Sequence, residues 1–137
     1  MEASEARRRP HPADRFAGAE HVLDLGTALK ALRSERGPNA SGHRQITLLH
    51  HGPVRMVLFA FAAGGRLPDH RAPGWITIHV LRGAIAVRTA EARHTLGAGQ
   101  LLALDPGVSH DVEASEESDM LLGVYPPVPM GSSASGA

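Results

Sequence analysis

Hydrophobic and polar positions alternate with a period of two along most of the chain between residues 46 and 125. This period is typical of β-strands with one buried face, because successive side chains point to opposite faces of a sheet. Turn sequences such as Gly52-Pro53 and Asp105-Pro106-Gly107 separate the alternating segments. The pattern predicts seven strands, over 46–50, 54–62, 75–82, 84–89, 101–104, 111–114 and 120–125.

One segment ahead of the strands has a helical period instead. Leu25, Leu29 and Leu32 recur at the spacing of one helix face. Asp24 precedes them as an N-cap residue, and Gly37-Pro38 ends the run. Because no helical crossover separates the strands, a parallel α/β sheet is excluded and an antiparallel barrel or sandwich is favoured.

The length of 137 residues suits one domain. Residues 1–19 are charged and aperiodic, and residues 126–137 are rich in proline, serine and glycine. We therefore expect a flexible N-terminal arm over 1–19, one folded domain over 20–125 and a disordered tail over 126–137. The acidic run over 113–119 is expected to be a solvated hairpin.

Composition excludes several classes of function. The chain has no cysteine, so disulfides, thiolate metal sites and cysteine nucleophiles are absent. Fourteen basic and fourteen acidic residues cancel, which leaves no field for nucleic acid or an anionic membrane. No apolar run reaches the roughly 18 residues of a membrane span, and no secretion signal follows Arg7-Arg8-Arg9, so a cytoplasmic protein is expected. No nucleotide cofactor is expected, because Gly97-Ala98-Gly99 lacks a following helix.

The region from Gly64 to Ala114 resembles the two signature motifs of the cupin superfamily, a group of small jelly-roll barrels. The matching residues are Gly64, His70 and Gly83 in the first motif, and Gly99, Gly107 and His110 in the second. The phrases over 67–74 and 109–114 are similar to those of a group of small bacterial cupins. The resemblance implies an all-β fold, a single cupin (jelly-roll) β-barrel with one short N-terminal helix.

Metal-binding cupins resemble one another in using three histidines and one glutamate inside the barrel. The resemblance implies His70 and His110 as ligands of one divalent transition metal, Fe, Mn, Ni, Cu or Zn. At the other two ligand positions this chain has Ala72 and Ile76, which cannot ligate. His79 becomes a third ligand only if a bulge shifts the register of its strand by one residue.

Strand alternation predicts whether three further residues near this site face the barrel interior. His50 is another candidate ligand, because it shares a face with the apolar residues of its strand. Asp69 and Asp111 are neighbours of the two histidines, so they are expected to face away from them.

The expected barrel interior is apolar with one polar corner, which suits a small, largely hydrophobic ligand with one polar group. Its predicted lining residues are Ala72, Ile76, Ile78, Val80, Leu102 and Val112. A homodimer is expected, with Val57, Phe59 and Phe61 offered to the partner and Trp75 as a further contact.

Three functions stay open at this point. The first is a small-molecule-binding cupin that uses His70 and His110, with a divalent metal held weakly or with the help of His79. The second is a metal-dependent enzyme of the dioxygenase or isomerase type. The third is a metal-free binding or sensor module. Metal-free catalysis of the epimerase type pairs a histidine base with a tyrosine acid. The only tyrosine, Tyr125, ends the last strand and is poorly placed for that role.

Overall fold

The computed structural model describes residues 19–35 and 41–127. The predicted arm and tail lie outside these ranges except for Ala19, Pro126 and Pro127, and Gly37-Pro38 lies outside them too. The described residues form one helix and nine strands: α3 (Leu25–Ser34), β1 (His43–His51), β2 (Val54–Phe61), β3 (Arg66–His70), β4 (Trp75–Arg82), β5 (Ala84–Arg88), β6 (Arg93–Gly97), β7 (Leu101–Leu104), β8 (His110–Ala114) and β9 (Ser118–Tyr125).

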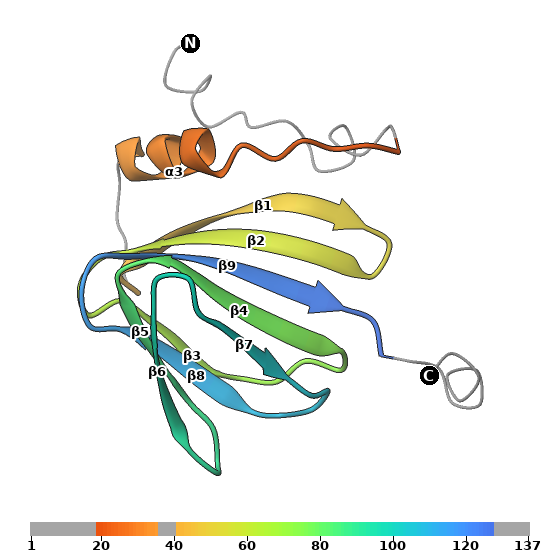
Figure 1. Cartoon of the computed structure of the whole chain (residues 1–137), viewed down its shortest axis with the longest axis vertical. Helices are drawn as coiled ribbons and strands as arrows, with labels where there is room; N and C mark the ends of the chain where they lie inside the picture. Colours follow the sequence, from red (N-terminus) through yellow and green to blue (C-terminus); the bar gives the residue numbers. More distant parts are fainter. Residues whose placement is uncertain (1–18, 36–40, 128–137) are drawn as a thin grey trace.

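The strands form two antiparallel sheets that face each other (Figure 1). Five strands make one sheet in the order β1-β2-β9-β4-β7, and four make the other in the order β3-β8-β5-β6. The chain crosses repeatedly from one sheet to the other, as in a jelly roll. The all-β jelly-roll prediction is confirmed, although the strands stay in two sheets and do not close into one barrel.

The alternation located seven of the nine strands. The segments over 75–82 and 101–104 have these bounds in the structure, and the other five differ at their ends by one to three residues. The two strands without a prediction, β3 and β6, are the edges of the four-stranded sheet. Both are five-residue strands with mostly polar or exposed positions, and β3 contains Pro68, a residue that edge strands tolerate, so neither has the clear alternation of a half-buried strand.

The main core lies between the sheets and includes Val57, Phe59 and Phe61 of β2. These three side chains are at most 4% exposed, so the prediction that they face a partner is wrong. Both faces of β2 are apolar, because Leu58 and Ala60 alternate with them and are also buried. The period of two therefore identified the strand without telling which face meets the core.

The helix α3 covers the outer face of the five-stranded sheet, over β1 and β2 (Figure 1). Asp24 caps it as predicted, because its Oδ1 accepts a hydrogen bond of 3.0 Å from the backbone N–H of Thr27. This bond lowers the pKa of Asp24. Leu32 is fully buried and packs with Leu58 and Ala60, so the outer apolar face of β2 belongs to a second, smaller core.

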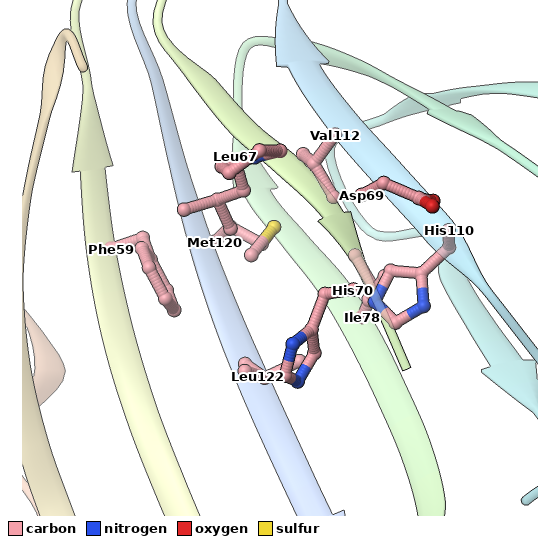
Figure 2. A pocket seen from close by; sticks show the side chains of 10 residues that line it. Phe59, Leu67, Asp69, His70, Ile78, His110, Val112, Met120 and Leu122 are labelled. Atoms are coloured by element: carbon pink, nitrogen blue, oxygen red, sulfur yellow. The ribbon is translucent and has the colours of Figure 1, made fainter. Parts of the chain in front are cut away.

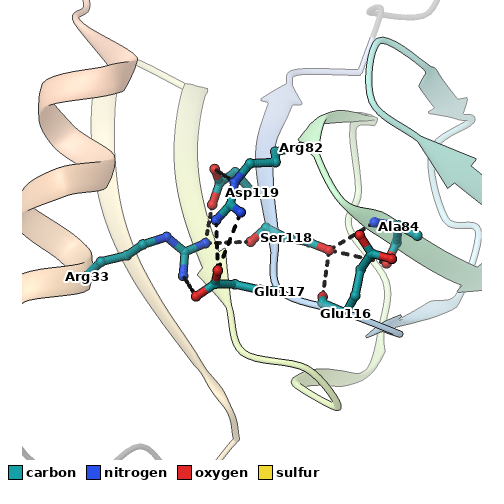
Figure 3. Close-up of polar contacts among 7 residues, drawn as sticks. All are labelled: Arg33, Arg82, Ala84, Glu116, Glu117, Ser118 and Asp119. Atoms are coloured by element: carbon teal, nitrogen blue, oxygen red, sulfur yellow. Dashed lines mark hydrogen bonds and ion pairs between the residues drawn. The ribbon is translucent and has the colours of Figure 1, made fainter.

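Ion pairs join α3 to the start of β9 (Figure 3). Asp119 is 5% exposed and accepts hydrogen bonds from Arg33 of α3 and, at 3.0 Å, from Arg82 of β4. Ser118 is fully buried and accepts a 3.0 Å hydrogen bond from the backbone N–H of Ala84. The expectation of a solvated hairpin over 113–119 is therefore wrong for Ser118 and Asp119, which begin a buried strand, and for Ala114, which is fully buried at the end of β8.

Ser118 also explains one glycine of the first motif. Gly83 has a φ of +89°, and a Cβ at this position would lie 2.2 Å from Oγ of Ser118. Only glycine fits both the backbone conformation and the space at the turn between β4 and β5.

Candidate functional site

A cavity of about 230 Å³ lies between the two sheets (Figure 2). Its walls come from β2, β4 and β9 of one sheet and from β3 and β8 of the other. The lining residues are Phe59, Leu67, Pro68, Asp69, His70, Ile78, His110, Val112, Met120 and Leu122. The site is thus an apolar chamber with two imidazoles and one carboxylate in its lining.

The predicted pocket overlaps this lining only at Ile78 and Val112. Ala72, Ile76 and Val80 are buried in the core between the sheets, and Leu102 is partly buried against it; none of the four lines the cavity.

The cavity lies instead toward β2 and β9, which supply Phe59, Met120 and Leu122. Phe59 pairs with Met120, and Leu122 pairs with Ile78, because β9 lies between β2 and β4 in the sheet. Alternation could have flagged these residues as inward-facing, but it does not reveal strand order.

The two predicted histidines lie together. His70 at the end of β3 is paired with His110 at the start of β8 across the sheet. Their ring centroids are 6.0 Å apart, and the ring planes are nearly perpendicular at 86°. His110 is 5% exposed, whereas His70 lies at the exposed mouth of the cavity. One histidine is thus an interior group and the other is open to solvent.

The buried histidine is held in one orientation. Nδ1 of His110 lies 3.2 Å from the backbone carbonyl oxygen of Val108. A carbonyl oxygen only accepts hydrogen bonds, so Nδ1 carries a proton and donates it. In the neutral ring, Nε2 then has a free lone pair. Figure 2 shows this nitrogen on the side of the ring that faces His70 and the cavity.

Asp69 is one of the lining residues of the cavity, and Figure 2 shows its carboxylate pointing away from the ring of His70. A bulge between Leu67 and His70 interrupts the regular pairing of β3 with β8 at this point. Ser109 donates a hydrogen bond of 2.9 Å from Oγ to Oδ1 of Asp69. The carboxylate of Asp69 is therefore bonded to Ser109 at the exposed rim of the cavity.

Asp111 does not line the cavity, in agreement with the alternation. It forms an ion pair with Arg88 of β5, with 2.8 Å between Nη2 and Oδ2. This hydrogen bond raises the pKa of Arg88. Asp111 thus has a partner on the neighbouring strand and is held outside the site.

The two other candidate metal ligands are not brought to this site. His79 pairs with Leu121 and Leu101, and it alternates with Ile78, which faces the cavity. No bulge moves it inward, because the register of β4 with β9 is regular from Trp75 to Val80. His50 is exposed on β1.

The side chains here do not fit a tightly held metal ion. Among residues 19–35 and 41–127, no group of three or more histidines, aspartates and glutamates is arranged to bind one. Ala72 and Ile76, at the two other ligand positions of the first motif, are buried apolar residues. Catalytic metal sites commonly have three protein ligands, and this one offers two imidazoles.

The family model described as "Cupin domain" matches residues 57–124, which include β3 to β8, all of β9 except Tyr125, and both histidines of the cavity. The chain belongs to the cupin superfamily. Its motif residues and its two-sheet jelly roll agree with this assignment. No helix in the described part of this cupin is long and apolar enough to span a membrane.

Solved structures support the fold of this cupin. A conserved Streptococcus pyogenes protein of unknown function has 22% identity and a TM-score of 0.65, over 84% of this chain and 94% of that one. An RmlC-like cupin from Shewanella frigidimarina has 17% identity and a TM-score of 0.63, over 78% and 92%. KdgF from a Halomonas species has 17% identity and a TM-score of 0.58, over 72% and 90%. No curated protein matches the chain.

Proposed function

We propose that this cupin binds a small molecule in the cavity between its sheets, with His70 and His110 as the polar contacts. The observation that carries the proposal is a preformed apolar chamber of about 230 Å³ with a pair of facing imidazoles in its wall. Ligand sites are typically concave and apolar with a few convergent polar groups. The cavity between β3, β8 and the five-stranded sheet has this combination.

The size of the cavity sets the size of the ligand. An engineered cavity of about 150 Å³ binds benzene, and drug-sized ligands occupy about 300–1,000 Å³. A cavity of about 230 Å³ falls between these values. We therefore expect a ligand of about one ring with small substituents.

A divalent transition metal is a weaker candidate for the same two histidines. Two imidazoles leave most coordination positions to water, so Fe, Mn, Ni, Cu or Zn would exchange readily. A metal-dependent dioxygenase or isomerase lacks its usual ligand set here, because Ala72 and Ile76 cannot ligate. Epimerase-type chemistry lacks its acid, since the hydroxyl of Tyr125 lies 3.5 Å from Oγ1 of Thr77 and does not line the cavity.

Two variants and a control test the proposal. The double variant His70→Ala/His110→Ala removes the polar contacts, and Leu67→Trp fills the cavity from its partly buried rim. His79→Ala is the matched control, because it removes an imidazole on the other face of β4. Each protein is screened by thermal shift and by ligand-observed NMR with one-ring compounds and with divalent metal chlorides.

We expect one-ring compounds to bind the wild type and His79→Ala, and to lose binding in the other two variants, which keep the circular dichroism spectrum of the wild type. Binding that survives Leu67→Trp would contradict the cavity as the site. If the double variant fails to fold, Leu67→Trp still decides where the ligand binds. If only metal chlorides stabilise the wild type, and the double variant loses this effect, the result would favour a metal over an organic ligand.

A further inference from the structure

We infer that the ligand of this cavity is a neutral ring compound with a hydroxyl group, of the phenol class, whose O–H donates a hydrogen bond to Nε2 of His110. This inference rests on the proposed function and names its ligand class. Three features of the cavity lead to it: the proton position on His110, the charge of the lining and the shape of its apolar wall.

The proton position makes His110 an acceptor toward the cavity. Nδ1 donates to the carbonyl oxygen of Val108 at 3.2 Å, so the neutral ring presents the lone pair of Nε2 to the interior. His110 is 5% exposed, so water has little access to that lone pair once the cavity is filled. A ligand without a hydrogen-bond donor would leave this nitrogen unsatisfied, which costs binding free energy.

The charge of the lining disfavours ions. None of the ten lining residues is lysine or arginine, so a carboxylate or phosphate would meet no fixed positive charge. Asp69 is the one fixed charge in the lining, and it adds repulsion for anions. Its Oδ1 already accepts a hydrogen bond from Ser109, and the residue is exposed at the rim. An ammonium group would thus meet the carboxylate of the lining at the exposed rim, outside the apolar chamber.

The wall suits a flat ring. Phe59, Met120 and Leu122 form the side contributed by β2 and β9 (Figure 2). A phenylalanine ring offers an aromatic face, and a methionine sulfur packs favourably against an aromatic ring. A single six-membered ring with one hydroxyl matches both this wall and the cavity volume of about 230 Å³.

The test is a series of four ring compounds titrated into the wild-type chain by NMR chemical-shift perturbation. Phenol carries the donor, anisole replaces the O–H with O–CH₃, benzoate carries a negative charge and benzylamine a positive one. We expect phenol to bind about 10-fold more tightly than anisole, the usual effect of one hydrogen bond, and more tightly than both ions.

The variant His110→Phe keeps a flat ring at this position and removes the acceptor. We expect it to abolish the preference for phenol over anisole while anisole still binds. His79→Phe makes the same change outside the cavity and should leave the preference unchanged. If His110→Phe does not fold, the four-compound series on the wild type decides the question by itself.

The outcomes separate the ligand class from the proposed function. Equal binding of phenol and anisole, or tighter binding of benzoate or benzylamine, overturns the phenol class. If none of the four binds, but another small molecule binds the wild type and loses binding in Leu67→Trp, the phenol class is overturned and the proposed function stands. If no small molecule binds the wild type, both are overturned.

Discussion

Asp119 shows how one residue can join two parts of the molecule. It begins β9 almost fully buried, and it meets Arg33 from α3 and Arg82 from β4. A buried carboxylate is tolerated when positive partners neutralise it and donate hydrogen bonds to its oxygens. The hydrogen bond from Arg82 to Asp119 raises the pKa of Arg82, and that guanidinium therefore stays charged throughout the ordinary pH range.

We predict that Asp119→Ala lowers the free energy of unfolding by about 2 kcal/mol, since it removes the buried carboxylate that Arg33 and Arg82 share and leaves them the exposed Glu117 as their acidic partner. This figure is below the usual cost for a broken buried pair, because the arginine side chains are 29% and 50% exposed. The raised pKa of Arg82 keeps the pair's contribution present below the ordinary arginine pKa and removes it only as pH rises through the raised value. Urea unfolding at pH 6 and pH 9 should therefore show the same loss. Glu117→Ala, at a side chain 58% exposed, is the control and should change little.

The two histidines were predictable because each falls at a fixed distance from a glycine of its motif. The place of Asp69 at the rim of the cavity was not predictable, because the bulge in β3 leaves no mark in a sequence that already contains Pro68. The same applies to the choice of inner face on β2, where Phe59 and Leu58 are equally apolar. The sequence was thus informative for the histidines, which are uncommon residues at fixed motif positions. It was uninformative for neighbouring apolar residues, which differ only in the face of the sheet to which they point.

At the scale of elements, α3 acts as a cover for the five-stranded sheet. Its apolar stripe and its N-cap were both readable in the sequence. The surface that it covers could not be predicted, because the alternation does not show that β9 lies beside β2 in the sheet. The cover also explains why β2 is apolar on both faces: one face meets the sheet opposite, and the other meets the helix.

We predict that Leu32→Ala destabilises the protein by about 3 kcal/mol, because Leu32 is fully buried between α3 and the sheet. Lys30→Ala, on the exposed side of the same helix, keeps or slightly raises helix propensity and should leave stability unchanged within about 0.5 kcal/mol. Chemical denaturation of both variants measures the difference. A loss at Leu32 no larger than that at Lys30 would mean that α3 does not hold the sheet in solution.

At the scale of the whole molecule, the outer face of the five-stranded sheet is divided in two. One half lies under α3, and the other half, on β4 and β7, carries Trp75 and Leu101. These side chains are 38% and 54% exposed, and no described element covers them. Exposed apolar residues on a sheet face are candidates for contact with another chain.

The homodimer therefore stays a prediction, but its expected interface is now the face that carries Trp75 and Leu101. We expect light scattering to give the mass of two chains for the wild type and of one chain for the double variant Trp75→Asp/Leu101→Asp. Val22→Asp is the control, since Val22 is 99% exposed ahead of α3 and away from β4 and β7. A wild type with the mass of one chain would refute the dimer.

The strand β9 touches both the cavity and the helix. Met120 and Leu122 line the cavity, while Asp119 and Leu121, on the opposite face, contact Arg33 and the core beneath α3. A ligand that immobilises Met120 and Leu122 also restricts the motion of the backbone that carries Asp119 and Leu121. One layer of sheet thus separates α3 from a ligand in the cavity. We expect the fluorescence of a dye attached to α3 to change when a ligand binds. A chain without cysteine makes this labelling simple, because one cysteine introduced at Lys30 takes the dye at a single position.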